Sequence, residues 1–224
     1  AFCMIVVGFG GIWYFVGDAG AMIKIVTISF RQVSNADMAV LPLFLLMAQV
    51  CSNSGMSRDL YTLAARWMGR LPGGLAMSTI GACAGFSAIS SSSIATAVTI
   101  GEVAMPEMRK YNYKPELASG CIAAGGTLGV LIPPSFILIL YGIMTESSIR
   151  ELFIAGIIPG ILAALFYMIA IYILCKWKPQ YGPQASPSTF REKIAAFKSC
   201  AEISLLILLV LGGLMIGWFT PSEA

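Results

Sequence analysis

The feature that most constrains this chain is a polar interruption inside apolar sequence. Serines crowd residues 85–97 (GFSAISSSSIATA), between apolar segments at residues 75–86 and 94–105. Each segment is about 12 residues, or about 18 Å as an α-helix, whereas the hydrocarbon core of a bilayer is about 30 Å thick. Neither segment can cross alone, so the sequence predicts a helical hairpin that enters a membrane, turns at the serines and leaves by the same face.

The composition places the chain in a membrane. Of its 224 residues, 58% are hydrophobic and 11% are charged, against about 25% charged residues in a soluble domain. The mean hydropathy is +0.83. We therefore expect an all-α integral membrane protein surrounded by lipid. The net charge of +3 is small and dispersed, which argues against a nucleic-acid partner.

The reactive side chains exclude several classes of site. The six cysteines form no CxxC pair and histidine is absent, so a transition metal would find almost no ligands. No histidine or buried acid stands beside the serines to activate a nucleophile. We expect no enzyme activity, no transition metal and no organic cofactor.

The remaining sequence alternates apolar and polar segments. Membrane segments are predicted at residues 2–16, 38–51, 117–141, 152–175 and 201–219. Between them lie an interfacial connection or partly amphipathic helix, a surface helix, a charged loop, a short turn and a polar linker, at residues 17–36, 54–70, 106–116, 145–151 and 176–198. We predict three parts: scaffold-like helices at 1–72, the hairpin with a broken helix at 73–142, and further membrane helices at 143–224.

The positive charges agree with a hairpin that returns to its own face. On that layout the three loops at residues 54–70, 106–116 and 176–198 share one side and hold three, three and five Lys or Arg. The opposite side receives only Lys24, Arg31 and Arg150. The first side is predicted to be cytoplasmic. Two full crossings in place of the hairpin would leave the same loops on the same sides of the membrane. The length of the segments, and not the charge, therefore favours the hairpin.

A second interruption lies at residues 125–135 (GGTLGVLIPPS). It comes about 12 to 17 residues after the cytoplasmic start of its helix, or roughly 18–25 Å deep, and the serine turn is at roughly 18–22 Å. Each break alone is better explained by close helix packing. Their matched depth favours a shared site near the middle of the membrane.

The two breaks offer groups for ions of both signs. Pro133 and Pro134 free backbone carbonyls around residues 129–131, at the negative end of a half-helix. Hydroxyl and backbone oxygens of Ser90, Ser92 and Ser93 face them, which suits a cation. Ser93 is predicted to cap one helix and Ser135 to begin another, and two helix amino ends favour a carboxylate substrate nearby.

Several stretches together resemble the large membrane subunit of TRAP transporters, the tripartite ATP-independent periplasmic carriers. They are ISSSSIATA, GEVAMPEMRKYNYKPELASG, AAGGTLGVLIPPS, LYGIMTESSIRELFIAGIIPG and FTPSEA, at residues 89–97, 101–120, 123–135, 140–160 and 219–224. The motifs occur in the family's order over essentially the whole chain. The resemblance implies a sodium-driven importer of organic acids, such as C4-dicarboxylates or sialic acids, in the bacterial inner membrane.

The resemblance also implies partners, a mechanism and site residues. A periplasmic binding protein would deliver the substrate and a small membrane subunit would support this one. The fold would be the first inverted repeat of an elevator-type transporter. One sodium ion would lie between Ser90 and Ser92 and the backbone of Gly129, Ile132 and Pro134.

The chain departs from the family pattern in two respects. The family commonly has glycine where this chain has Ser91. The large subunit is usually about twice this length, and the resemblance covers its first half. Because the chain starts without methionine inside an apolar run, we expect a piece of a longer protein.

Two other functions remain open from the sequence. Glu102 near the end of the hairpin could couple a different broken-helix carrier to protons, although its closeness to the charged loop favours an interfacial carboxylate. Alternatively, the chain could be a non-transporting scaffold that docks a partner through residues 54–70.

Overall fold

The computed structural model describes residues 2–34, 40–184 and 189–218, and within these ranges every regular element is a helix. The chain divides into two compact units, Ala1–Val40 and Leu41–Ala224. The expectation of an all-α protein is confirmed for the described residues. The predicted three-part division at residues 72 and 142 stays a prediction.

The first unit contains α1 (Phe2–Val16) and α2 (Asp18–Val33), which pack against each other. Gly17 joins them with a φ of 81°, in the left-handed region that glycine adopts readily. Inside α1, the rings of Phe9 and Trp13 meet edge to face with their centres 5.3 Å apart. The connection predicted at residues 17–36 is therefore a helix over most of its length.

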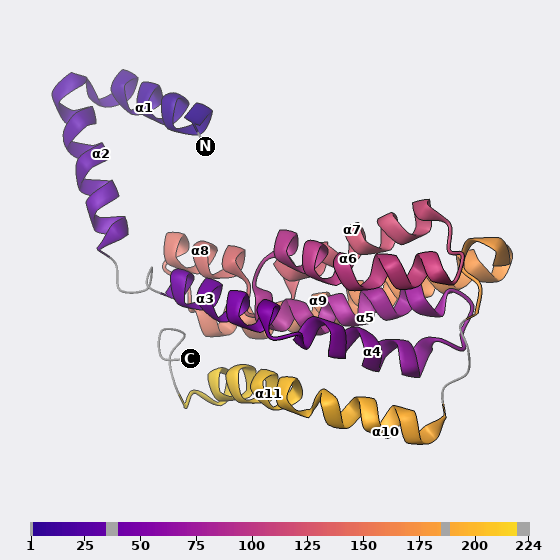
Figure 1. The fold of residues 1–224 in the computed structure, drawn as a ribbon. Coiled ribbons are helices and arrows are strands. Elements are labelled where there is room, and N and C mark those ends of the chain that lie inside the picture. Colours follow the sequence, from indigo (N-terminus) through magenta and orange to yellow (C-terminus); the bar gives the residue numbers. More distant parts are fainter. Residues whose placement is uncertain (1, 35–39, 185–188, 219–224) are drawn as a thin grey trace. The chain divides into compact units, whose positions relative to one another are not determined.

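The second unit begins with α3 (Val40–Asn53) and α4 (Met56–Met68). Its remaining helices are α5 (Gly74–Ser90), α6 (Ser93–Lys110), α7 (Pro115–Leu131), α8 (Phe136–Thr145), α9 (Ile149–Trp177), the short 3₁₀ helix η2 (Pro179–Tyr181), α10 (Phe190–Ser199) and α11 (Ala201–Ile216). Helices α5, α6, α7 and α9 lie side by side and form the main core (Figure 1).

Helices α5 and α6 form a hairpin. They hold 17 and 18 residues, or about 26 and 27 Å, so they are longer than the sequence predicted and still shorter than a 30 Å bilayer core. The backbone N–H of Leu75 donates to the Tyr113 hydroxyl oxygen at 3.2 Å, which ties the two open ends together. The charged loop predicted at residues 106–116 is wrong at its start, because α6 continues through Pro106 to Lys110.

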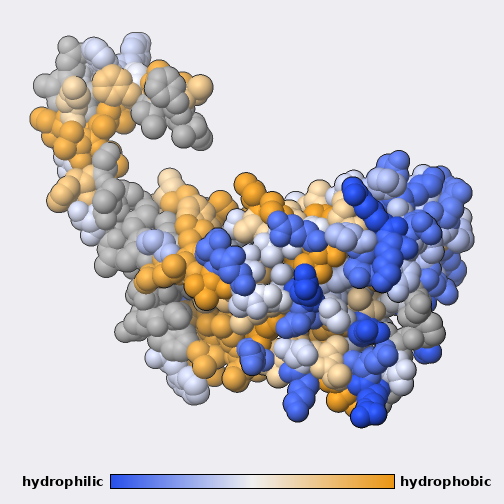
Figure 2. Space-filling view, viewed as in Figure 1, coloured by the Kyte–Doolittle hydropathy of each residue, from blue (hydrophilic) through white to orange (hydrophobic). Residues whose placement is uncertain are grey.

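Three connections meet at the open end of this hairpin. The N–H of Gly73 donates to the Gly182 carbonyl and that of Lys114 donates to the Tyr181 carbonyl, each at 3.1 Å. The Lys114 ammonium lies 4.2 Å from the centre of the Tyr181 ring. Hydrophilic surface gathers where α6 ends and α7 begins, and hydrophobic surface covers neighbouring parts (Figure 2). The start of α5, the end of α6 and the end of α9 therefore share one polar end.

Two helical stretches among the described residues are long and apolar enough to cross a bilayer. They are Pro115–Thr145, which includes the α7–α8 break, and Ile149–Trp177. Helices α10 and α11 make a third if they act as one span, bent by 49°. The polar linker predicted at residues 176–198 contains most of α10, which begins with a capping box between Thr189 and Glu192.

Candidate functional site

Helices α5 and α7 run in parallel, and three contacts fix their register. Leu75 meets Tyr113 at the polar end, and Ser91 meets Phe136 at the other. Between them, a Cβ added to Gly125 would lie 2.7 Å from the Cys83 sulfur atom. The absence of a side chain at residue 125 therefore lets the two helices approach closely.

Helix α6 lies against the same part of α7. A Cβ on Gly126 would lie 2.7 Å from the Cβ of Ala97, and one on Gly129 would lie 2.9 Å from the backbone nitrogen of Ser93. At the break itself, the N–H of Phe136 donates to the Ser91 carbonyl at 3.5 Å. The prediction that the serine turn and the proline break are neighbours is confirmed.

The serine turn is built from hydroxyls that bond locally. Ser91 has a φ of 52° and ends α5. Ser92 is the residue that caps α6, and its hydroxyl oxygen accepts from the N–H of Ala95 at 3.3 Å. The predicted cap at Ser93 is therefore wrong by one residue, because Ser93 already belongs to the helix. Ser90 and Thr96 share a hydrogen bond of 2.6 Å between their hydroxyls across the turn.

The proline break leaves backbone oxygens without their helical donors. Pro133 and Pro134 have no N–H to offer to the carbonyls of Gly129 and Val130, four residues before each. The Ser135 hydroxyl donates to the Val130 carbonyl at 2.7 Å. Ser135 is the residue before α8, but its side chain makes no capping bond there. The Gly129 carbonyl is thus left facing the break.

The predicted residues differ in their exposure. Ser90 and Ser135 are buried, as are Gly129 and Pro134. A second group is half-buried, namely Ser92, Ser93 and Ile132. The structure brings both groups to the contact between the two breaks, where hydroxyl and carbonyl oxygens are enclosed by helices.

Sequence reasoning missed three hydroxyls at this contact. Thr96 pairs with Ser90, and the hydroxyl oxygens of Ser87 and Ser91 are buried without a hydrogen-bond partner among the described residues. Ser87 could have been found from its spacing, because it stands one helical turn before Ser90 and Ser91 in an otherwise apolar helix. The hydrogen bond between Thr96 and Ser90 depends on the geometry of the turn, so no local sequence pattern predicts it.

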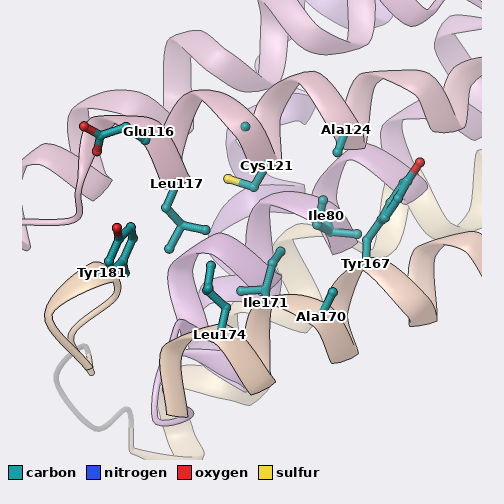
Figure 3. A pocket seen from close by; sticks show the side chains of 11 residues that line it. Ile80, Glu116, Leu117, Cys121, Ala124, Tyr167, Ala170, Ile171, Leu174 and Tyr181 are labelled. Atoms are coloured by element: carbon teal, nitrogen blue, oxygen red, sulfur yellow. The ribbon is translucent and has the colours of Figure 1, made fainter. Parts of the chain in front are cut away.

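A separate cavity of about 330 Å³ lies between α5, α7 and α9. Its walls are mostly apolar side chains, including Leu117, Ile171 and Leu174, with Glu116 and Tyr181 toward one end (Figure 3). This lining offers no cluster of oxygen ligands. The cavity is therefore not the predicted ion site.

A second cavity, of about 520 Å³, lies between α4 and α6 and is charged. Its walls include Arg58, Arg66 and Lys110 together with Glu102 and Glu107. Glu102 lies on the exposed face of α6, about 13 Å along that helix from its start at the serine turn. The structure thus separates Glu102 from the two breaks.

Comparison with known proteins identifies the chain. Residues 1–224 match the family described as "Tripartite ATP-independent periplasmic transporter, DctM component". The chain belongs to this DctM family. The family is one of transporter components, and the family resemblance drawn from the sequence is confirmed.

The relatives of this DctM-family chain include permeases named for different substrates. It is 36% identical over 195 residues to the C4-dicarboxylate TRAP transporter large permease protein DctM of Pseudomonas aeruginosa, covering 87% of this chain and 45% of the relative. It is 33% identical over 195 residues to the sialic acid large permease SiaM of Vibrio cholerae, covering 86% and 44%. With the ectoine large permease TeaC of Halomonas elongata it shares 30% over 214 residues, covering 96% and 50%. The chain spans about half the length of these relatives.

Proposed function

We propose that this chain is part of the large permease of a sodium-coupled TRAP transporter that imports organic acids across the bacterial inner membrane. The observation that carries the proposal is the backbone contact between the serine turn and the proline break. Broken helices whose carbonyl ends hold sodium recur in secondary transporters. Relatives named for C4-dicarboxylate and sialic acid support an organic acid as the substrate.

The sodium ion would lie where the breaks meet. Ser90 and Ser92 would supply oxygens from the turn, and the backbone of Gly129, Ile132 and Pro134 would supply them from the break. These oxygens are uncharged and hard, which suits an alkali cation. The negative end of α7 adds to the attraction, because its last carbonyls point into the break.

The substrate carboxylate would bind at the beginnings of α6 and α8. Ser93 is the first residue of α6 and Ser135 precedes α8, so both stand where helical N–H groups lack partners. Helix amino ends favour anions. The hydroxyl of Ser135 already donates to the Val130 carbonyl, so a carboxylate at this position would bind through the backbone N–H groups at the start of α8.

The whole transporter would contain further components. A small membrane subunit and a periplasmic substrate-binding protein would assemble with this permease, as the tripartite description of the family implies. The α5–α6 hairpin would be re-entrant, because its arms of 17 and 18 residues are shorter than the hydrocarbon core of a bilayer, which is about 30 Å thick. Together with the α7–α8 break it would form one inverted repeat that moves as an elevator.

The two alternatives find less support in the geometry. A proton-coupling Glu102 would stand on an exposed face beside basic residues, away from the breaks. A scaffold role for α4 would compete with α10, which already packs on it through an ion pair between Arg66 and Glu192 at 2.7 Å. Uptake that ignores sodium but collapses with the pH gradient would favour the first alternative.

The test is sodium-dependent uptake by the complete transporter carrying Ser90→Ala or Ser92→Ala. Each change removes an ion ligand, so the sodium concentration for half-maximal uptake should rise about two- to tenfold. Ser92→Ala also removes a helix cap. Its matched control is Ser148→Ala, because Ser148 caps α9 by accepting from Glu151 at 3.4 Å, far from the breaks in sequence.

Ser90→Ala has a control in the same helix. The Ser78 hydroxyl donates to the Gly74 carbonyl at 2.7 Å and is equally buried, at the other end of α5. Ser78→Ala should leave the sodium dependence unchanged. If the Ser90 and Ser92 variants match their controls in sodium dependence at normal expression, the proposed site is wrong.

A further inference from the structure

Two buried hydroxyls near the tip of the hairpin lack partners. The side chains of Ser87 and Ser91 are 0% and 4% exposed, and neither hydroxyl oxygen has a hydrogen-bond partner among the described residues. Serines inside helices usually donate to a carbonyl one turn earlier, as Ser78 does in this same helix. A buried hydroxyl that gives up this bond is costly unless something else binds it.

The helix register brings residues 87 and 91 level with the proline break. Cys83 of α5 stands level with Gly125 of α7, and the two helices are parallel. One turn further along each helix, Ser87 stands level with Gly129. Another turn reaches Ser91, whose carbonyl receives the N–H of Phe136 beyond the prolines. Ser87 and Ser91 therefore face the proline break from α5.

We propose that Ser87 and Ser91 are additional ligands of the bound cation, which extend its shell onto the α5 side of the break. This inference rests on the proposed sodium site and names two groups that the family resemblance does not assign. On this register both residues stand level with the end of α7, where the Gly129 carbonyl lacks a helical donor. A cation between them would satisfy all three oxygens at once.

The conformation of Ser91 gives the proposal a sharp test. Its φ of 52° is unfavourable for a residue with a Cβ and easy for glycine. Ser91→Gly removes the hydroxyl and relieves the backbone, whereas Ser91→Ala removes the hydroxyl and keeps the strain. Both changes remove a buried hydroxyl without a partner, but only glycine also relieves the backbone, so Ser91→Gly should raise the thermal stability measured without sodium by more than Ser91→Ala does.

The experiment measures uptake and sodium-dependent thermal stabilisation in the complete transporter. We expect Ser91→Gly, Ser91→Ala and Ser87→Ala each to raise the sodium concentration for half-maximal effect by about two- to tenfold. Ser91→Gly should do so although its sodium-free stability is higher than that of the parent. Ser78→Ala is the control, since that hydroxyl is satisfied within α5.

The outcomes separate this inference from the proposed function. If Ser90→Ala and Ser92→Ala weaken the sodium dependence but Ser87→Ala and Ser91→Gly leave it unchanged, the two extra hydroxyls bind only water and the inference is overturned. If none of the four changes sodium dependence, the proposed sodium site itself is wrong. Stabilisation by Ser91→Gly with unchanged sodium affinity would show that residue 91 matters only for the turn.

Discussion

Gly129 allows the most direct perturbation of the contact between the two breaks. A Cβ at this position would lie 2.9 Å from the Ser93 nitrogen and 3.0 and 3.1 Å from the Ser92 carbonyl carbon and oxygen. All three are backbone atoms, so no side chain can rotate away. Ordinary contact begins at 3.4 Å, so Gly129→Ala must move the serine turn by about 0.5 Å.

The energetic cost follows from this overlap. Overpacking of this kind costs about 1–3 kcal/mol, partly offset by the roughly 1 kcal/mol that alanine gains over glycine inside a helix. We expect Gly129→Ala to lower the free energy of unfolding by up to about 2 kcal/mol. A displacement of 0.5 Å also exceeds the roughly 0.2 Å tolerance of metal–ligand distances, so stabilisation by sodium should weaken.

The assay is thermal unfolding of the purified protein in detergent, with and without sodium. The matched control is Gly120→Ala in the same helix, where an added Cβ would meet no atom within 4 Å. This control should gain about 0.5–1 kcal/mol from helix propensity alone. If Gly129→Ala is as stable as the control and responds equally to sodium, the close backbone contact at the breaks is refuted.

Two further predictions concern the polar end and the α4–α10 contact. The side chains of the Arg66–Glu192 ion pair are 44% and 48% exposed, respectively. A double-mutant cycle should therefore give a coupling energy below about 1 kcal/mol that decreases in high salt. A coupling energy above about 2 kcal/mol that does not depend on salt would contradict this prediction. Burial raises the pKa of Tyr113, in the loop between α6 and α7, to about 12 from its ordinary 10.0. The folded form keeps the phenol neutral while the unfolded form ionises, so this contribution to stability is full below pH 10 and is lost as pH rises toward 12. Tyr113→Phe should lower the free energy of unfolding by about 1 kcal/mol at pH 7, because the Leu75 N–H loses its acceptor. Between pH 10 and 12 the free energy of unfolding of this variant should fall less steeply with pH than that of the parent. The same fall in the variant and the parent would exclude Tyr113 as its source.

The elements that the sequence predicted well are those set by local chemistry. Proline lacks an N–H wherever it stands, so the break after α7 could be placed from Pro133 and Pro134 alone. Serines favour helix ends, which located the turn to within one residue of Ser92. The neighbourhood of the two breaks followed from counting residues from one face.

What the sequence could not give depends on packing between helices. Pro106 suggested the end of α6, but the helix continues because the residues after it are held by the core, with Met108 0% exposed. The pairing of Ser90 with Thr96 arises from the turn geometry across six residues. By contrast, Thr189 and Glu192 carried a recognisable capping spacing, so the beginning of α10 was available from the sequence.

The glycine contacts of α7 have a consequence for how an ion at the proposed site could leave. At Gly126 and Gly129, helix α7 touches the start of α6 through small side chains and backbone atoms, so no flexible side chains lie between the two helices to rearrange and open a gap. Separating the α5–α6 hairpin from α7 would break all of these close contacts at once. We therefore expect the ion to exchange with water when the α5–α6 hairpin and the α7–α8 broken helix move together relative to the rest of the protein. A covalent cross-link between α5 and α7 should then leave ion exchange unchanged.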